Sequence, residues 1–121
     1  MKKKSDPRHL RRAAIMQDLF SWQFKTDKKP RVKIAKIVNK LSVIDKLIAK
    51  SAPDRPIGEI NRIDLAILRL AVFELIIEVG TPPKVVIDEA IELGKEFGSD
   101  SSAAFINGAL GKIIKLRKIH T

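Results

Sequence analysis

The segment from residue 62 to residue 78 constrains the fold most, because on a helix it is apolar around nearly its whole circumference. Its sequence is RIDLAILRLAVFELIIE, and Asn61 just before it is a typical N-cap residue. A helix that is apolar on every side must be surrounded by other elements. Glu74 and Glu78 interrupt the apolar run, so it does not fit a membrane span. We therefore predict a central helix inside a helical bundle.

Four further helical segments are predicted, and no stretch shows the alternation that is typical of a strand. Asp6 and Pro7 suit the N-cap and first position of a helix that continues to residue 24. A polar connector leads to a helix over residues 33–52, and the sequence SAPDRPIG then forms a turn or a short helical bend. The predicted fold is an all-α, compact bundle of about five helices. It forms one domain over residues 1–121, with residues 1–7 as a flexible basic arm.

Apolar residues recur at helical spacing in each segment. The first helix is apolar on two sides, so we expect it to be sandwiched; one side has Leu10, Ala13, Phe20 and Phe24, the other Ile15, Leu19 and Trp22. The second carries one unbroken stripe, which is Ile34, Ile37, Leu41, Ile44 and Ile48. The inward side of the last helix is Phe105, Ile106, Ala109, Leu110, Ile113 and Ile114.

Two glycines stand inside the last predicted helix, where each costs about 1 kcal/mol relative to alanine. They are Gly108 and Gly111. The helix before it is well delimited, because Thr81 suits an N-cap followed by two prolines and Gly98 suits its end. Something is therefore expected to approach the backbone at the glycines. A close crossing with a neighbouring helix would explain Gly108 equally well.

The formal net charge of +10 is unevenly distributed along the chain. Residues 1–55 hold 16 Lys and Arg against 5 Asp, and residues 56–110 hold 4 basic against 9 acidic residues. Residues 111–121 add four basic residues. This separation favours a polyanion on one surface and a basic protein partner on another. The alternative, a basic surface that only maintains solubility, would not require it.

Several function classes do not fit the composition. The chain has no cysteine, and His9 and His120 lie near opposite ends, so neither a disulfide nor a metal site is expected. No P-loop or GxGxxG motif predicts a cofactor, and no nucleophile accompanies the paired carboxylates Glu74 and Glu78. The basic start lacks the apolar core of a signal peptide. We predict a cytoplasmic protein that is not an enzyme and uses no cofactor.

Three blocks in the second half of the chain resemble the NusB family in order and spacing. They are RIDLAILRLAVFEL (62–75), TPPKVVIDEAIELGKEFG (81–98) and FINGAL (105–110), and RRAAIMQDLFSWQF (11–24) resembles the first helix of that family. The resemblance implies an all-helical fold of two three-helix bundles. It also implies a role in transcription antitermination, with binding of boxA RNA together with NusE, a small-subunit ribosomal protein, at the transcribing RNA polymerase. This chain has less sequence after its first helix than typical members, so its N-terminal half is expected to be shortened.

A basic cluster near the N-terminus is the first candidate RNA-binding site. Arg8 and Arg12 lie four residues apart on one helix face, so both guanidinium groups can reach one phosphate backbone. By resemblance they align with arginines of the RNA-binding segment of the family, although His9 and Leu10 depart from its pattern. The alternative is a solvated basic arm. The cluster comprises Lys2, Lys3, Lys4, Arg8, Arg11 and Arg12.

Two further groups extend this predicted RNA surface. Gln17 and Phe20 resemble family positions near the RNA, where an amide can bind a base edge and a ring can stack, although Phe20 also fits the core. The polar side of the last helix supplies the other group. It comprises Asn107, Gly108, Gly111, Lys112 and Lys115. Gly111 departs from the family, which often has a charged or polar residue there.

The acidic residues Glu74, Glu78 and Asp88 are candidates for contact with the basic partner NusE, on the strength of the resemblance. A solvated face is the alternative for all three. A different function for the whole chain is an RNA-binding module that assists rRNA modification or ribosome assembly, because a similar domain occurs fused to rRNA cytosine methyltransferases. No methyltransferase domain is present in this sequence.

Overall fold

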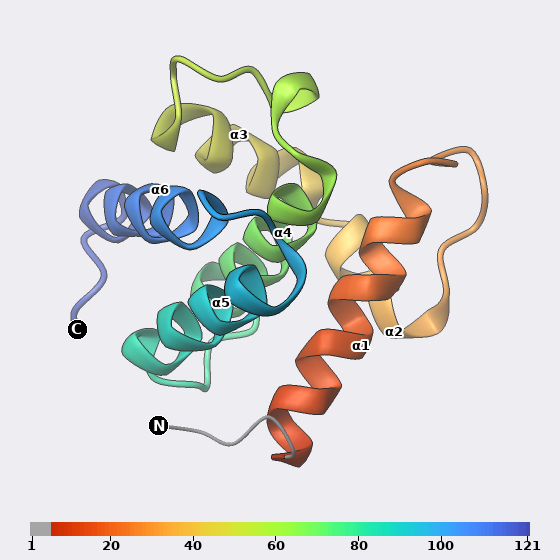
Figure 1. The fold of residues 1–121 in the computed structure, drawn as a ribbon, viewed down its shortest axis with the longest axis horizontal. Helices are drawn as coiled ribbons and strands as arrows, with labels where there is room; N and C mark the ends of the chain where they lie inside the picture. Colours follow the sequence, from red (N-terminus) through yellow and green to blue (C-terminus); the bar gives the residue numbers. More distant parts are fainter. Residues whose placement is uncertain (1–5) are drawn as a thin grey trace.

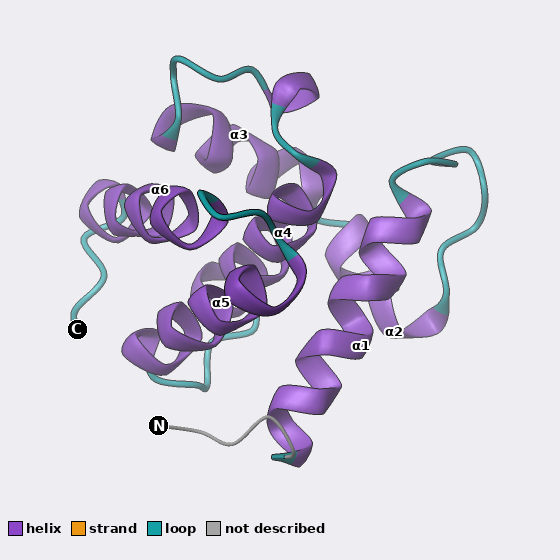
Figure 2. Cartoon of the chain, viewed as in Figure 1, coloured by secondary structure: helices purple, strands orange, loops and turns teal. Residues whose placement is uncertain are grey.

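A computed structural model describes residues 6–121, and these residues form six α-helices, one short 3₁₀ helix and no strand (Figures 1 and 2). The helices are α1 (Pro7–Trp22), α2 (Val32–Val38), α3 (Leu41–Ser51), η1 (Ile57–Glu59), α4 (Arg62–Ile76), α5 (Pro83–Phe97) and α6 (Ser102–Leu116). The all-α prediction is confirmed. The predicted site residues Lys2, Lys3 and Lys4 lie outside the described residues.

Helix α4 is the centre of the fold, as the sequence predicted. Every residue from Asp64 to Phe73 is buried, and α1, α2, α3, α5 and α6 all pack against this helix. The Asn61 side chain caps it by accepting a hydrogen bond of 2.8 Å from the Ile63 N–H. Neither α4 nor another helix among residues 6–121 is long and apolar enough to cross a bilayer.

The predicted second helix is two helices, so the single unbroken helix was wrong. The α-helical bonding stops at Asn39 and Lys40, where the Lys40 N–H bonds to the Ile37 carbonyl only three residues back. Asparagine is a poor helix former, which favours a break there. The break lets one apolar stripe serve two neighbours, since α2 packs on α1 and α4 whereas α3 packs on α4 and α6.

Helix α1 buries one face completely, and that face differs from the predicted ones. The buried residues are His9, Ala13, Met16 and Leu19. Leu10 and Phe24, which the sequence placed on an apolar side, are more than half exposed. The sequence did not reveal this buried face because its first residue, His9, is polar and was not counted among the apolar positions. The sandwich itself is confirmed, because α1 packs against α4 and also against α2.

The start of α5 corrects a second prediction. Pro82, and not Thr81, occupies the N-cap position, and no side chain caps the helix. Thr81 lies one residue too early to reach the first N–H groups. Its hydroxyl instead lies 3.5 Å from Nη2 of Arg12, so it contributes to the contact between α4, α5 and α1.

The crossing of α5 and α6 depends on two glycines at the end of α5. A Cβ on Gly94 would lie 2.9 Å from Cδ1 of Ile106, and one on Gly98 would collide with the Ser102 side chain. Gly98 ends α5 as predicted. The alternative explanation of Gly108, a close helix crossing, does not hold, because the close approach lies at Gly94.

Candidate nucleic-acid interface

A cleft of about 480 Å³ lies between α1, α2 and α4, and its rim is rich in basic side chains. Arg8 and Arg11 project into it from α1, and Lys33 and Lys36 from α2. All four residues are exposed. Cations gathered around a concave surface concentrate positive potential there, which suits a polyanion. We call this feature the α1–α2 cleft.

The two arginines on the α1 side of the rim differ in their internal contacts. Arg8 donates to the carboxylate of Asp6 with its Nε and Nη2 atoms, at 3.2 and 3.0 Å, and its side chain stays 63% exposed. The hydrogen bond and charge of Asp6 raise the pKa of Arg8. Arg11 forms no ion pair among residues 6–121. Both side chains are therefore accessible to a ligand from solvent.

Arg12 is the exception among the predicted cations, because contacts within the chain hold it. Its Nε and Nη2 atoms donate to both oxygens of Glu74 at 2.9 and 2.8 Å, and Nη1 lies 3.5 Å from Glu89. The hydrogen bond to Glu74 raises the pKa of Arg12, against the opposing effect of burial. Its side chain is only 13% exposed. Arg12 therefore holds α1 against α4 and α5 and is poorly placed to contact RNA directly.

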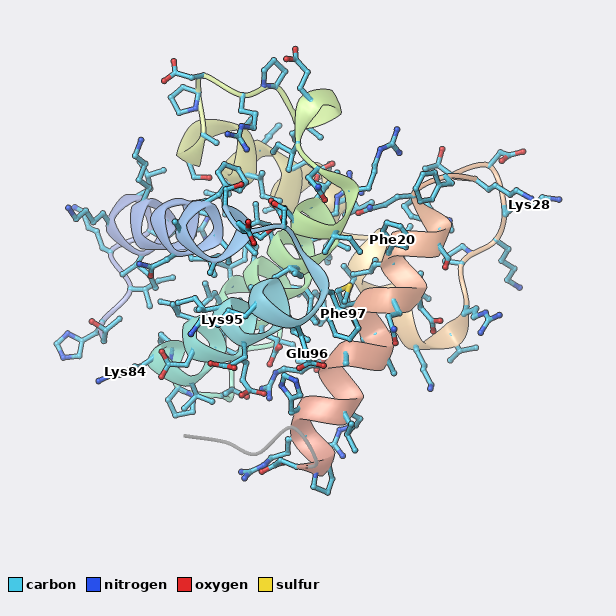
Figure 3. The ribbon with its side chains drawn as sticks, viewed as in Figure 1. Phe20, Lys28, Lys84, Lys95, Glu96 and Phe97 are labelled. Atoms are coloured by element: carbon cyan, nitrogen blue, oxygen red, sulfur yellow. The ribbon has the colours of Figure 1, made fainter. Side chains whose placement is uncertain are left out.

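His9 forms a second buried connection between α1 and α5. Nδ1 lies 3.2 Å from Glu89 and Nε2 lies 2.7 Å from Glu96. Figure 3 shows Glu96 where α5 meets α1. A neutral imidazole has one N–H donor, whereas ionised carboxylates only accept, so both contacts together require the imidazolium form. Burial lowers the pKa of His9, but the hydrogen bonds and charges of Glu96 and Glu89 outweigh it and the net shift is upward.

We expect the protein to lose stability as the pH rises through the raised pKa of His9. Above the ordinary value of 6.5 the folded protein still holds this proton while the unfolded chain releases it, so deprotonation favours unfolding in that window. Urea unfolding at about pH 6 and about pH 8.5 should give a lower free energy of unfolding at the higher pH. A His9→Gln variant should lose this difference, and a difference of unchanged size in the variant would contradict the role of His9.

The predicted site residues on α6 share one exposed stripe. Asn107, Gly108, Gly111, Lys112 and Lys115 are all exposed. A Cβ on either glycine would meet nothing within 4 Å, so helix packing within the described chain explains neither of them. The stripe borders a groove of about 350 Å³, in which the Arg55 guanidinium lies 4.3 Å from the centre of the Phe105 ring.

Because this stripe is open, Gly108→Ala and Gly111→Ala should each stabilise the protein. Each replacement removes the backbone entropy penalty of a helical glycine, and the new methyl group enters open space. The expected gain is about 0.5–1 kcal/mol per site, measured as the free energy of unfolding in urea. Lower stability in either variant would show that the helix is packed at that position.

The structure does not bring all of the predicted RNA-binding residues together. α6 packs on α3, α4 and α5, while α1 packs on α2 and α4, so α4 and α5 lie between α6 and the pair α1 and α2 (Figure 1). Gln17 is exposed on α1 but lines a different groove. Phe20 is half-buried against the core, with its ring 5.0 Å from that of Phe24, which fits the core alternative (Figure 3).

The three predicted partner-binding carboxylates have different surroundings. Glu74 is paired with Arg12, and its side chain is 16% exposed. Glu78 is exposed and lies 3.8 Å from Lys36, and Asp88 is exposed on α5. Only Glu78 and Asp88 are therefore available to a partner. Among residues 6–121, no group of three or more acidic, histidine or cysteine side chains could hold a metal ion.

The fold and the cleft define an all-helical protein with a cationic face between its first two helices. Comparison with known proteins places it further: residues 31–115 match the model of the NusB family, and the chain belongs to that family. It is 39% identical to the transcription antitermination protein NusB of Treponema denticola, over 83% of this chain and 80% of that protein. It is 48% identical to the protein of the same name from Chloroflexus aggregans, but over 60% of this chain and only half the length of that relative.

Solved structures agree with this assignment. The NusB of T. maritima superposes with a TM-score of 0.80 at 31% identity, covering 95% of this chain and 93% of the other. A chain in the crystal structure of a plectonemic RNA supercoil has the same fold at 21% identity, with a TM-score of 0.77 over 94% of this chain and 98% of the other. The predicted family and the predicted fold class are thus confirmed.

Sequence reasoning missed Lys33 and Lys36 as members of the cleft. It also missed the contact of His9 with Glu89 and Glu96. A signal for His9 was present, since it begins the spacing i, i+4, i+7, i+10 that continues through the buried face of α1. The partners on α5 had no comparable signal, because they lie 80 and 87 residues away in the chain.

Proposed function

We propose that this chain is a noncatalytic, RNA-binding transcription antitermination factor that binds boxA-like RNA together with NusE. The α1–α2 cleft is the observation that carries the proposal, because it gathers four exposed cations from two helices. Membership of the NusB family and the names of its relatives support the same role. The proposal places the protein in the cytoplasm with the transcription elongation complex.

The cleft is suited to single-stranded RNA by the chemistry of its rim. Arg8 and Arg11 can contact phosphates with a planar fork of donors or stack on unpaired bases, whereas Lys33 and Lys36 act as compact charges on the backbone. Arg12 would act indirectly, because its bond to Glu74 fixes the position of α1 beside α4. Binding in this way needs no catalytic group.

The proposed surface for NusE lies on the acidic part of the chain. Glu78 and Asp88 are exposed and could attract a basic ribosomal protein. Glu74 supports this surface from within, through its pair with Arg12. Glu78 also lines the α1–α2 cleft and lies 3.8 Å from Lys36, so RNA and NusE would approach adjoining surfaces at the loop between α4 and α5.

Binding of labelled boxA-like RNA and a scrambled RNA across a salt series, with and without NusE, tests the proposal. With about four phosphates neutralised, log affinity should fall against log salt with a slope near −3 for single-stranded RNA. Replacing Arg8 and Arg11 together with alanine should flatten the slope by about 1.4 and weaken binding about tenfold at low salt. Lys84→Ala with Lys95→Ala, two exposed cations on α5 (Figure 3), is the matched control and should change neither value.

Two results would contradict the proposal. Equal affinity for both RNAs, unchanged by NusE, would remove the antitermination role and favour the alternative of an rRNA-associated module. An equal loss of affinity in the control variant would show that overall charge, and not the α1–α2 cleft, determines binding.

A further inference from the structure

A second basic groove lies at the other end of α1, where the chain turns into α2. It measures about 490 Å³, and it shares no lining residue with the α1–α2 cleft although both are built on the same two helices. Four cations surround it, and all four are exposed: Lys25, Lys28, Lys29 and Arg31. None of them is among the residues that the sequence assigned to RNA binding. We call this feature the loop groove.

Charge in the loop groove is poorly balanced within the protein. Arg31 lies 3.6 Å from Asp18 but its side chain remains 83% exposed. Asp18 belongs to α1, and Asp27 is the carboxylate of the loop itself. Within residues 6–121, no ion pair is formed by Lys25, Lys28 or Lys29. Exposed cations that are unpaired and close together repel one another, and a bound polyanion relieves that repulsion.

Hydrogen bonds hold the loop in place against α1. The indole Nε1 of Trp22 donates to the Lys28 carbonyl at 3.0 Å, and the Lys25 N–H donates to the Trp22 carbonyl at 2.9 Å. The Lys28 N–H then bonds to the Lys25 carbonyl at 3.0 Å. Lysines on a fixed loop lose less freedom on binding than lysines on a mobile one, so the charges are arranged in advance.

The lining of the groove favours nucleic acid as its occupant. Beside the cations it presents the half-buried indole of Trp22, the exposed amide of Gln17 and the exposed hydroxyl of Ser21. Lysines contact phosphates without reading sequence, while an amide and an aromatic ring accommodate unpaired bases. Helix α2 has seven residues, about 10 Å of length, so one strand of a few nucleotides can pass from the α1–α2 cleft to the loop groove.

We propose that the loop groove binds the phosphate backbone of RNA that flanks the segment held in the α1–α2 cleft. The inference rests on the proposed function and adds a second, sequence-independent contact to the same RNA strand. It explains why basic residues continue along the loop beyond the cleft. It also predicts that affinity depends on RNA length.

The test compares a minimal boxA-like RNA of about 10 nucleotides with one of about 20 that carries flanking sequence. Replacing Lys25, Lys28 and Lys29 with alanine should weaken binding of the longer RNA about tenfold and flatten its salt slope by about 2. Binding of the shorter RNA should change less than twofold. Lys46→Ala, Lys84→Ala and Lys95→Ala together form a control with the same loss of charge on exposed residues of α3 and α5, and should leave both affinities unchanged.

Trp22 supplies an independent readout, because it is the only tryptophan of the chain and the sequence contains no tyrosine. Its fluorescence should change when the longer RNA binds and should change little with the shorter one. Far-UV circular dichroism confirms that the variants remain folded.

Each outcome bears on a distinct claim. Suppose that the unaltered protein binds the short RNA. If the loop variant then loses equal affinity for both RNAs, or loses none for either, the loop groove is overturned while the proposed function stands. Failure of the unaltered protein to bind either RNA overturns both. An acidic peptide could also change the fluorescence of Trp22. If the longer RNA does not displace that peptide, the groove belongs to a protein partner and the inference is overturned.

Discussion

Replacing Arg69 with alanine is expected to lower the free energy of unfolding by about 4 kcal/mol, the largest effect of a single polar substitution in this chain. Arg69 lies on the central helix α4 and is buried. Its Nε and Nη2 donate to both carboxylate oxygens of Asp45 at 3.0 and 2.9 Å, and Nη1 donates to Oε1 of Gln23 at 3.0 Å. Removing the guanidinium leaves a partly buried carboxylate and a buried amide without their donor.

The contacts of Gln23 extend the effect of this substitution. Its side-chain Nε2 donates to the backbone carbonyl of Arg62 at 2.9 Å. The backbone carbonyl of Gln23 accepts a hydrogen bond from Nη1 of Arg62 at 3.1 Å. Arg69 thus joins the end of α1, the start of α4 and the middle of α3. Loss of Arg69 should loosen all three at once.

Urea unfolding of Arg69→Ala, Asp45→Ala and the double variant measures this contribution. The double variant should be more stable than Arg69→Ala alone, because it no longer contains an unpaired carboxylate. Purely additive losses would show that Arg69 and Asp45 do not interact. A loss below about 1 kcal/mol for Arg69→Ala would show that water replaces the missing donor.

Arg12→Ala is the second prediction of large effect, with an expected loss of about 3 kcal/mol. The substitution removes two hydrogen bonds to Glu74 and leaves that carboxylate half-enclosed between α1 and α4. The loss is expected to be smaller than at Arg69, because His9 still compensates the buried charge of Glu89. RNA affinity should also fall, through displacement of α1 with its exposed Arg8 and Arg11.

Arg12→Lys separates the structural role from direct contact with RNA. Lysine keeps the charge but cannot donate to both oxygens in the same geometry, so stability should fall to an intermediate value. Arg8→Ala serves as the control, because Arg8 is exposed and its loss should alter stability by less than about 0.5 kcal/mol. An Arg12→Ala variant of full stability with weak RNA binding would instead place Arg12 in direct contact with RNA.

The parts of the fold that the sequence predicted are those in which one helix determines its own pattern. Helix α4 is apolar on all sides and is therefore central, and the caps Asp6 and Asn61 act on N–H groups two or three residues away. These features need no knowledge of distant segments. The inward side of α6 was predicted correctly for the same reason.

The errors occur where a distant neighbour decides the outcome. The break at Asn39 separates two helices with different packing partners, and Thr81 contacts Arg12 instead of capping its own helix. His9 at the start of α1 and Glu89 in the middle of α5 carry complementary charge, but no local sequence pattern shows that they are in contact. The assignment of Arg12 to RNA stays a prediction, and in the structure its Nε and Nη2 atoms donate to Glu74.

Some of the residues that line the α1–α2 cleft were named from the sequence. Arg8 and Arg11 lie at the start of α1 and are exposed, and Arg8 stays exposed even though it donates to Asp6. Lys33 and Lys36 joined them only through the packing of α2 on α1 and α4, which has no sequence signature. The open stripe at Gly108 and Gly111 was expected to be approached, and no part of the described chain approaches it.

Amide chemical-shift mapping with boxA-like RNA tests the central claim most directly. Binding at the α1–α2 cleft predicts the largest changes at Arg8, Arg11, Lys33 and Lys36, with little change across the solvent face of α5. Changes that centre on α5 and leave α1 and α2 unaffected would contradict the assignment of RNA to this cleft.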